Sequence, residues 1–238
     1  MSVAGIRWPS IEDEPYGEPG RPFAGEKTVL FGAARRNFGQ VFVLMAGVWF
    51  ASNMASGLLP SLLGKQTDLS PTQITGTLVL VQFVHALCFP LIGALTDRIG
   101  RRTFFLANGV TVGVICALAF VLLAAGKLSG LPLVFLLTLV IRISGASMFA
   151  VTPSYICERF PASVRGSGFG MGYNLSLLVT AGYAYYQDWL SHLVPYAYTP
   201  VVLLVVGGVL IVVGAALGPE IKDVDLETVA AEARVRVA

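Results

Sequence analysis

One arginine stands inside an apolar stretch of this 238-residue chain, where its charge could bind a ligand. Arg142 lies about eleven residues after Leu131, and a helical rise of ~16 Å would place its guanidinium near the middle of a bilayer. A charge at that depth is costly unless it is paired. Asp97, Glu158 and Asp188 all stand at the ends of apolar stretches. The expected counter-ion is therefore a substrate carboxylate, a group outside this chain, or backbone carbonyls and water.

A guanidinium can hold a carboxylate by two parallel hydrogen bonds, so Arg142 is the candidate anchor of a substrate. The alternative is a structural arginine bonded to backbone carbonyls. The other candidate substrate-binding residues, which would orient the substrate from neighbouring segments, are Asn53, Gln82, Tyr173 and Asn174.

His85 lies within another apolar stretch. Its reference pKa of about 6.5 suits proton exchange, which makes it the candidate proton-coupling residue. A neutral, hydrogen-bonded histidine in the core is an equally good interpretation.

Catalysis and metal binding have no matching pattern in this sequence. The apolar stretches contain no pairing of a nucleophile with a base and no cluster of metal ligands, so we expect no catalytic residue, no enzyme activity, no cofactor and no metal ion. Cys88, Cys116 and Cys157 are odd in number, and none falls in an outer loop, which indicates free thiols. The formal net charge of +2 indicates no partner by itself, and we expect no nucleic acid.

The elements that position these residues are apolar helices. The chain is 55% hydrophobic and only 13% charged, a composition typical of membrane proteins. A spanning helix needs about 20 apolar residues, and the absence of alternation excludes strands. The predicted spans are Val41–Leu63, Ile74–Leu95, Thr103–Ala125, Leu131–Tyr155, Ser167–Leu190 and Thr199–Leu217. The predicted fold is an all-α membrane protein, a bundle of six transmembrane helices.

Three regions follow from this assignment: a cytoplasmic tail or linker at 1–39, the bundle at 40–218, and a cytoplasmic tail at 219–238. Of the 16 lysines and arginines, all except Lys65, Lys127 and Arg142 fall on one side of the predicted helices. The positive-inside rule makes that side cytoplasmic, so both termini are expected in the cytoplasm of a multi-pass cell-membrane protein.

Polar residues recur at helical spacing in the first, second, fourth and fifth spans. Such stripes face protein or water rather than lipid, which predicts a wet cavity between these helices with the third and sixth outside. The alternative is that the stripes only join helices through hydrogen bonds. Gly166, Gly168, Gly170 and Gly172 lack the spacing of a phosphate-binding loop, and close helix packing explains them better.

Three segments resemble those of a transporter family. Gly93–Arg102 resembles the loop signature G-x-L-x-D-R-x-G-R-R of the major facilitator superfamily, and every specified position matches. Glu158–Gly168 resembles the E-x-F-P-x-x-x-R-G-x-G loop of the second half of such proteins. It leads into Gly172–Leu175, which is similar to metabolite–proton symporters. Gly218–Glu227 resembles the tail of sugar and metabolite porters, except that Ile221 replaces the usual threonine.

The resemblance implies one six-helix half of a two-half transporter, with a second half supplied by an upstream segment or another chain. The implied function is secondary active transport of a small polar, anionic metabolite by alternating access, coupled to protons. Alternatives are an incomplete or split half-transporter, and a membrane scaffold or sensor of the same fold that transports nothing. The lipid bilayer, the metabolite and the proton are the expected partners.

The signature loop also predicts a cytoplasmic gate. An acid at the C-terminal end of a helix opposes that helix's dipole, so Asp97 should serve another purpose: it could cap the positive N-terminal end of an opposing helix or pair with Arg101. Glu158 is expected within reach of Arg98 or Arg102. Gly93 and Gly100 would permit close approach and a tight turn. The alternative is a set of solvated charges that only set topology. The candidate gate residues are Asp97, Arg98, Arg101, Arg102, Glu158 and Arg165.

Overall fold

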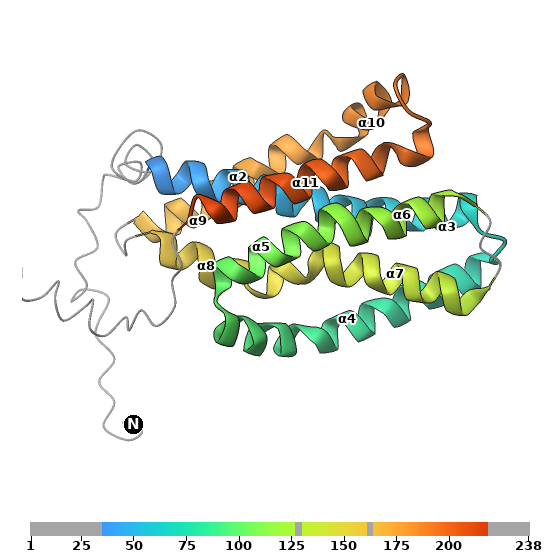
Figure 1. The fold of residues 1–238 in the computed structure, drawn as a ribbon, viewed down its shortest axis with the longest axis horizontal. Coiled ribbons are helices and arrows are strands. Elements are labelled where there is room, and N and C mark those ends of the chain that lie inside the picture. Colours follow the sequence, from blue (N-terminus) through green and yellow to red (C-terminus); the bar gives the residue numbers. More distant parts are fainter. Residues whose placement is uncertain (1–34, 127–129, 161–163, 219–238) are drawn as a thin grey trace, which may run out of the picture.

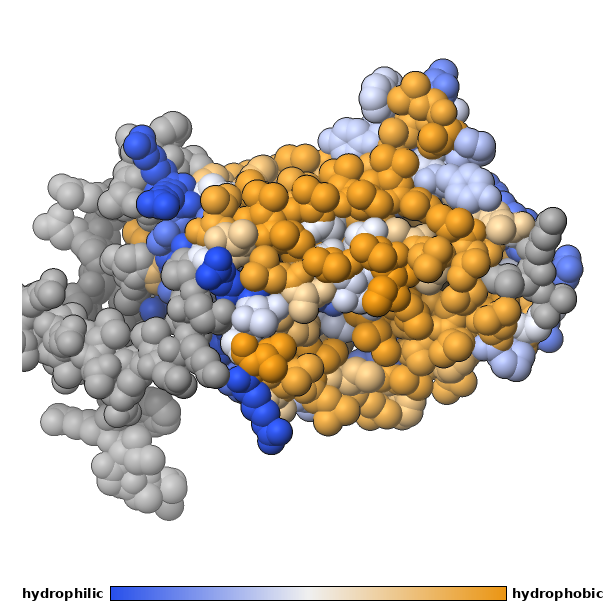
Figure 2. Space-filling view, in the orientation of Figure 1, coloured by the Kyte–Doolittle hydropathy of each residue, from blue (hydrophilic) through white to orange (hydrophobic). Residues whose placement is uncertain are grey.

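A computed structural model describes residues 35–126, 130–160 and 164–218. Helices make up the ordered elements of these residues, and no β-strand occurs among them. The long helices run side by side along the long axis of the molecule (Figure 1). Figure 2 shows apolar residues covering the middle of the molecule and hydrophilic residues gathered toward its two ends. This is the surface of a protein that spans a bilayer, and the all-α membrane fold is confirmed.

Several rods consist of consecutive helical segments. Five of them are long and apolar enough to cross a membrane within the described ranges: Arg35–Gln66, Pro71–Ile99, Arg101–Ala124, Leu131–Arg159 and Tyr196–Ala216. Their segments are α2 (Arg35–Ser52), η1 (Asn53–Leu58) and α3 (Leu59–Gln66); α4 (Pro71–Ile99); α5 (Arg101–Thr111), η2 (Val112–Cys116) and α6 (Ala117–Ala124); α7 (Leu131–Ala146), η3 (Ser147–Ala150) and α8 (Thr152–Arg159); and η5 (Tyr196–Tyr198) and α11 (Thr199–Ala216). Each covers one predicted span, and the first begins at Arg35 rather than at Val41.

The span predicted over Ser167–Leu190 is divided in two. α9 (Arg165–Ala181) ends at Gly182, and a separate helix, α10 (Tyr183–Ser191), follows it (Figure 1). Glycine is a poor helix former, and the residues after it include several tyrosines, a glutamine and an aspartate. The Tyr186 hydroxyl donates to the Val179 carbonyl at 2.8 Å across this break. A continuous helix was therefore the wrong expectation here.

α11 packs between α2 and α5 through glycines. A Cβ added to Gly208 would lie 2.7 Å from the Gly109 carbonyl oxygen, and one added to Gly214 would lie 2.6 Å from Leu44 Cα. Such small residues let helix backbones approach closely. The opposite face of α11 is exposed and consists of Val205, Val206, Val209 and Val213. The helix predicted to face lipid thus has one tightly packed face and one open apolar face.

The glycines at the start of α9 and those of the Gly93–Arg102 signature differ in their surroundings. A Cβ at Gly168 would lie 2.5 Å from the Phe160 ring, and one at Gly172 would lie 2.7 Å from Val41, so close packing is confirmed at both. An added Cβ at Gly166, Gly170 or Gly93 would meet nothing within 4 Å among the described residues, so close packing is not seen at these three. Gly100, with φ +89°, makes the tight turn between α4 and α5.

α4 is the least enclosed of the long helices. Only 11% of the residues in its most apolar 18-residue stretch are buried, and α4 contacts chiefly α7 and η3. Its exposed apolar side chains are Val79, Leu80, Phe83, Leu87, Leu91 and Leu95. Lipid or a further apolar protein surface must cover this face in the membrane.

Candidate functional site

A cavity of about 240 Å³ lies where α4 and α7 face the η1–α3 junction. Its lining comprises Ala55, Ser56, Leu59, Pro60, Leu78, Val81, Gln82 and Arg142. Arg142 Nη1 donates to the hydroxyl oxygen of Ser56. The predicted anchor and Gln82 are therefore brought together, although they come from helices far apart in the sequence.

Arg142 and two residues on the helical segments that line this cavity carry polar atoms without partners among the described residues; these two, Asn53 on η1 and Thr138 on α7, are not part of the lining itself. The Arg142 Nε atom, the Asn53 Nδ2 atom and the Thr138 hydroxyl are buried, and none forms a hydrogen bond within the described residues. An unpaired buried polar group costs about 1–3 kcal/mol, so these groups are suited to a ligand or water. Asn53 and Ser56 belong to a π-helical segment, η1, and such segments often occur at functional sites.

His85 lies one turn along α4 from Gln82. It is only 1% exposed, and neither ring nitrogen has a hydrogen-bond partner among the described residues. Its ring centroid is 4.8 Å from that of Phe89. The hydrogen-bonded core histidine considered from the sequence does not describe this environment.

Tyr173 and Asn174 on α9 lie apart from the cavity lining. Tyr173 packs in an aromatic cluster with its ring centroid 5.1 Å from that of Trp49 and 5.4 Å from that of Phe169. Trp49 Nε1 donates to the Tyr173 carbonyl at 3.1 Å, which joins α2 to α9. Asn174 is exposed, and its Nδ2 donates to the Gly170 carbonyl of its own helix at 2.8 Å.

The charged cluster at the end of α4 centres on Arg101. Its guanidinium pairs with Glu158 at the end of α8, and it lies 3.9 Å from the Asp97 carboxylate. Asp97 is 71% exposed, whereas Glu158 is only 21% exposed. The Arg101–Glu158 pair is therefore better enclosed than the Arg101–Asp97 pair, although its two residues are far apart in the sequence. Sequence reasoning had expected Arg98 or Arg102 as the partner of Glu158.

The other three candidate gate residues make different contacts. Arg102 Nε and Nη2 donate to the carbonyls of Ala215 and Ala216, each at 3.2 Å, and so cap the end of α11. Arg165 Nε donates to the Phe160 carbonyl at 3.4 Å. Arg98 is exposed, and neither ion pair in the described part of the chain includes it.

The sequence of this chain matches that of a known protein family. Residues 41–235 match the profile of the Major Facilitator Superfamily, which is most of the chain. The chain belongs to the Major Facilitator Superfamily. Membership makes it a membrane-embedded, multi-pass protein of a transporter family rather than an enzyme. No solved structure gives a significant match.

Relatives within this superfamily are transporters of small molecules. The chain is 29% identical over 138 residues to the proline/betaine transporter of Escherichia coli K12, covering 56% of this chain and 27% of that protein. It is 32% identical over 117 residues to the alpha-ketoglutarate permease of the same organism, 47% of this chain and 26% of the relative. It is 25% identical over 183 residues to the glycine betaine/proline/ectoine/pipecolic acid transporter of Dickeya dadantii, 74% and 35% respectively. The chain thus spans about a quarter to a third of these relatives.

A second polar network of this superfamily member was missed from the sequence. Arg159 Nε donates to Gln40 Oε1 at 2.9 Å, and Gln40 Nε2 donates to the Tyr155 hydroxyl at 3.1 Å and the Gly214 carbonyl at 2.6 Å. Asn37 Nδ2 donates to the Arg159 carbonyl at 2.7 Å. The available signal was the pair Asn37 and Gln40, one turn apart at the start of an apolar helix. This network ties α2, α8 and α11 together beside the Arg101–Glu158 pair.

Proposed function

We propose that this chain forms one six-helix half of a secondary transporter that moves a small polar anionic metabolite by alternating access. The observation that carries the proposal is Arg142, a cation in a cavity whose lining contains no carboxylate. Proline, betaine and α-ketoglutarate, which give relatives their names, all contain a carboxylate, and this supports an anionic group as the ligand of Arg142.

In this proposal Arg142 holds the substrate carboxylate while Ser56 fixes the guanidinium. The Gln82 side chain, which is in the lining, orients the remainder of the substrate. The Asn53 amide stands outside the lining on η1 and would join it after a local shift of that segment. Tyr173 and Asn174 stand outside the cavity lining, so they would contact substrate only after α9 has moved toward α7. Such a movement is what alternating access requires of the helices around a fixed site.

His85 is proposed to exchange the coupling proton. Its ring nitrogens have no hydrogen-bond partner among the described residues, and a carboxylate held by Arg142 would bring negative charge into the same group of helices. Binding of a carboxylate would then permit protonation of His85. Substrate and proton would enter the cavity together.

The Arg101–Glu158 pair is proposed as the centre of the cytoplasmic gate. It joins the beginning of α5 to the end of α8, so separation of these helices must break it. Asp97 assists from the preceding turn. The contacts of Arg102 with the end of α11 would hold the closed arrangement, and Arg98 and Arg165 would add positive charge at the same end of the molecule.

The proposed assembly contains a second six-helix half, from a neighbouring segment or another chain, against the open face of α4. Both termini would be cytoplasmic in the cell membrane. A scaffold or sensor that binds solute without moving it is the rival function. Solute-dependent stabilisation in the absence of flux would favour that rival.

Uptake by cells that express the chain with any coding segment beside it tests the anchor. Arg142→Lys should keep the fold but lower anion uptake about tenfold or more, because lysine cannot supply two parallel hydrogen bonds. Arg36→Lys, at an exposed arginine near the start of α2, is the matched control. If both Arg142→Lys and Arg142→Ala transported anions at the wild-type rate, the structural interpretation of Arg142 would replace this one.

A further inference from the structure

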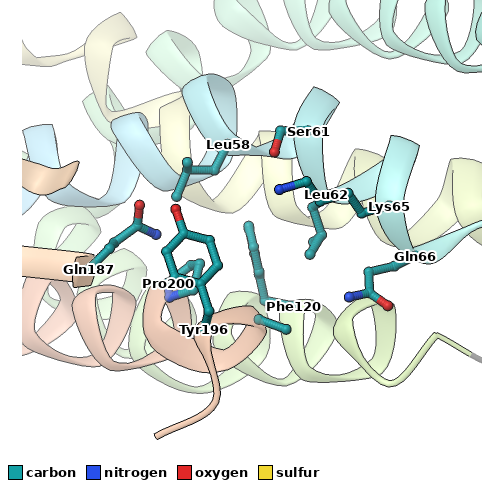
Figure 3. Close-up of a pocket in the computed structure, with 10 residues that line it drawn as sticks. Leu58, Ser61, Leu62, Lys65, Gln66, Phe120, Gln187, Tyr196 and Pro200 are labelled. Carbon is teal, nitrogen blue, oxygen red and sulfur yellow. The ribbon is translucent and has the colours of Figure 1, made fainter. Parts of the chain in front are cut away.

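A second pocket of about 240 Å³ (Figure 3) lies among α3, α6 and α10, at the end of the molecule opposite the start of α5 (Figure 1). It is formed where α3 and α6 meet α10 and the start of α11. Its lining consists of Leu58, Ser61, Leu62, Lys65, Gln66, Phe120, Gln187, Tyr196, Ala197 and Pro200. It shares no lining residue with the cavity of Arg142.

Two hydrogen-bond donors of this pocket are available to a ligand among the described residues: a buried, unpaired amide and an exposed ammonium that takes part in no ion pair there. Gln187 is 1% exposed, and its Nε2 atom is buried without a partner in the described residues. Lys65 Nζ lies 6.0 Å from the centroid of the Tyr196 ring, and neither ion pair of the described residues includes it. In Figure 3 the Lys65 side chain and the Gln187 amide approach the Tyr196 ring from opposite sides.

The remaining surface of the pocket is mostly apolar. Leu58, Leu62 and Phe120 supply aliphatic and aromatic walls, and Pro200 closes the side behind Tyr196 (Figure 3). A pocket of this kind holds an apolar body and fixes it by a few convergent polar groups. No carboxylate is among its lining residues, which disfavours a cationic ligand.

We propose that this outer pocket binds a carboxylate or phosphate group carried on an apolar body, with Lys65 and the Gln187 amide as its donors. The ammonium of Lys65 supplies the opposite charge, and the amide supplies a directed hydrogen bond. The same head group could belong to an anionic phospholipid of the surrounding membrane or to a soluble amphiphilic acid. This site is separate from the proposed transport site.

The test uses the full chain in nanodiscs, with Arg142→Ala introduced so that only the outer pocket can report a carboxylate. The soluble probe is hexanoate, measured by titration calorimetry, with hexanol as its neutral counterpart. The lipid probe is phosphatidylglycerol, measured by native mass spectrometry, with phosphatidylcholine as its counterpart. Binding of hexanoate alone identifies a soluble acid, and retention of phosphatidylglycerol alone identifies a lipid.

Lys65→Gln and Gln187→Leu should each weaken binding of the anionic probe about tenfold and leave the neutral counterpart unchanged. Lys65→Glu reverses an exposed charge, so it keeps the test valid if Gln187→Leu fails to fold. Arg36→Gln removes an exposed cation at the other end of the molecule and should bind as before. The proposal is overturned if neither hexanoate nor phosphatidylglycerol binds. It is also overturned if the Lys65 variants bind the anionic probe as tightly as the Arg142→Ala chain does.

Discussion

At the scale of single residues, the two acids beside Arg101 differ in what they can contribute. Asp97 is 71% exposed and 3.9 Å from the guanidinium, and an exposed ion pair contributes about 0–1 kcal/mol. Glu158 is 21% exposed and pairs directly with Arg101 across two helices. The more enclosed pair is the one whose loss should alter closure of the cytoplasmic side.

We therefore predict that Glu158→Gln slows transport more than Asp97→Asn, and that both variants reach the membrane in wild-type amounts. The loss should be about threefold or more for Glu158→Gln, the equivalent of about 0.7 kcal/mol. Flux is measured at equal membrane abundance, together with maleimide access to a cysteine at Ser154. Wild-type flux in both variants would remove the gate proposal.

The choice of partner for Glu158 shows what the sequence could not settle at this scale. A loop signature places several arginines within a few residues of one another, and the rotation of α5 decides which one faces α8. Arg101 faces Glu158, whereas Arg102 turns toward the end of α11. Gln40 and Arg159 were missed for the same reason, since their contact depends on how α2 and α8 pack.

At the scale of elements, the spanning helices could be predicted from hydropathy, because an apolar stretch of about 20 residues is enough to predict a spanning helix. Interruptions did not follow, since the π-helical segments η1 and η2 and the break at Gly182 arise from packing and local polarity. The prediction that α11 lies outside the cavity helices was made from its lack of polar side chains. The glycine contacts that hold its inner face required the neighbouring backbones to be in place.

We predict that Gly208→Ala destabilises the protein by about 1–3 kcal/mol, because the new methyl would lie 2.7 Å from backbone atoms of Gly109 and Gly113. Gly170→Ala is the matched control, since nothing lies within 4 Å of its added Cβ and alanine favours helix. Thermal unfolding in detergent measures both. Equal melting temperatures for the two variants would contradict close packing of α11 on α5.

At the scale of the whole molecule, both ends of the described bundle meet on one side. Asn37 near the start of α2 contacts Arg159, and Arg102 contacts Ala215 near the end of α11. The Asp97–Arg102 turn lies at this same end. The opposite end holds the α3–α4 turn, with Asp68 exposed in it. The five long helices together with the α9–α10 pair, taken as one further crossing, would give an even number of crossings. The positive-inside rule predicts that the arginine-rich end is the cytoplasmic one.

Labelling by a membrane-impermeant maleimide tests this topology in intact cells. The native cysteines are replaced by serine, and a single cysteine is introduced at Asp68 or at Arg36, both exposed. We expect external labelling at position 68 but not at position 36 until the cells are opened, because the arginines at the start of α2 should be retained in the cytoplasm. Opened cells control for reactivity at both positions. External labelling at position 36 alone would invert the orientation, and would place the Arg101–Glu158 pair and the outer pocket on the opposite sides of the membrane.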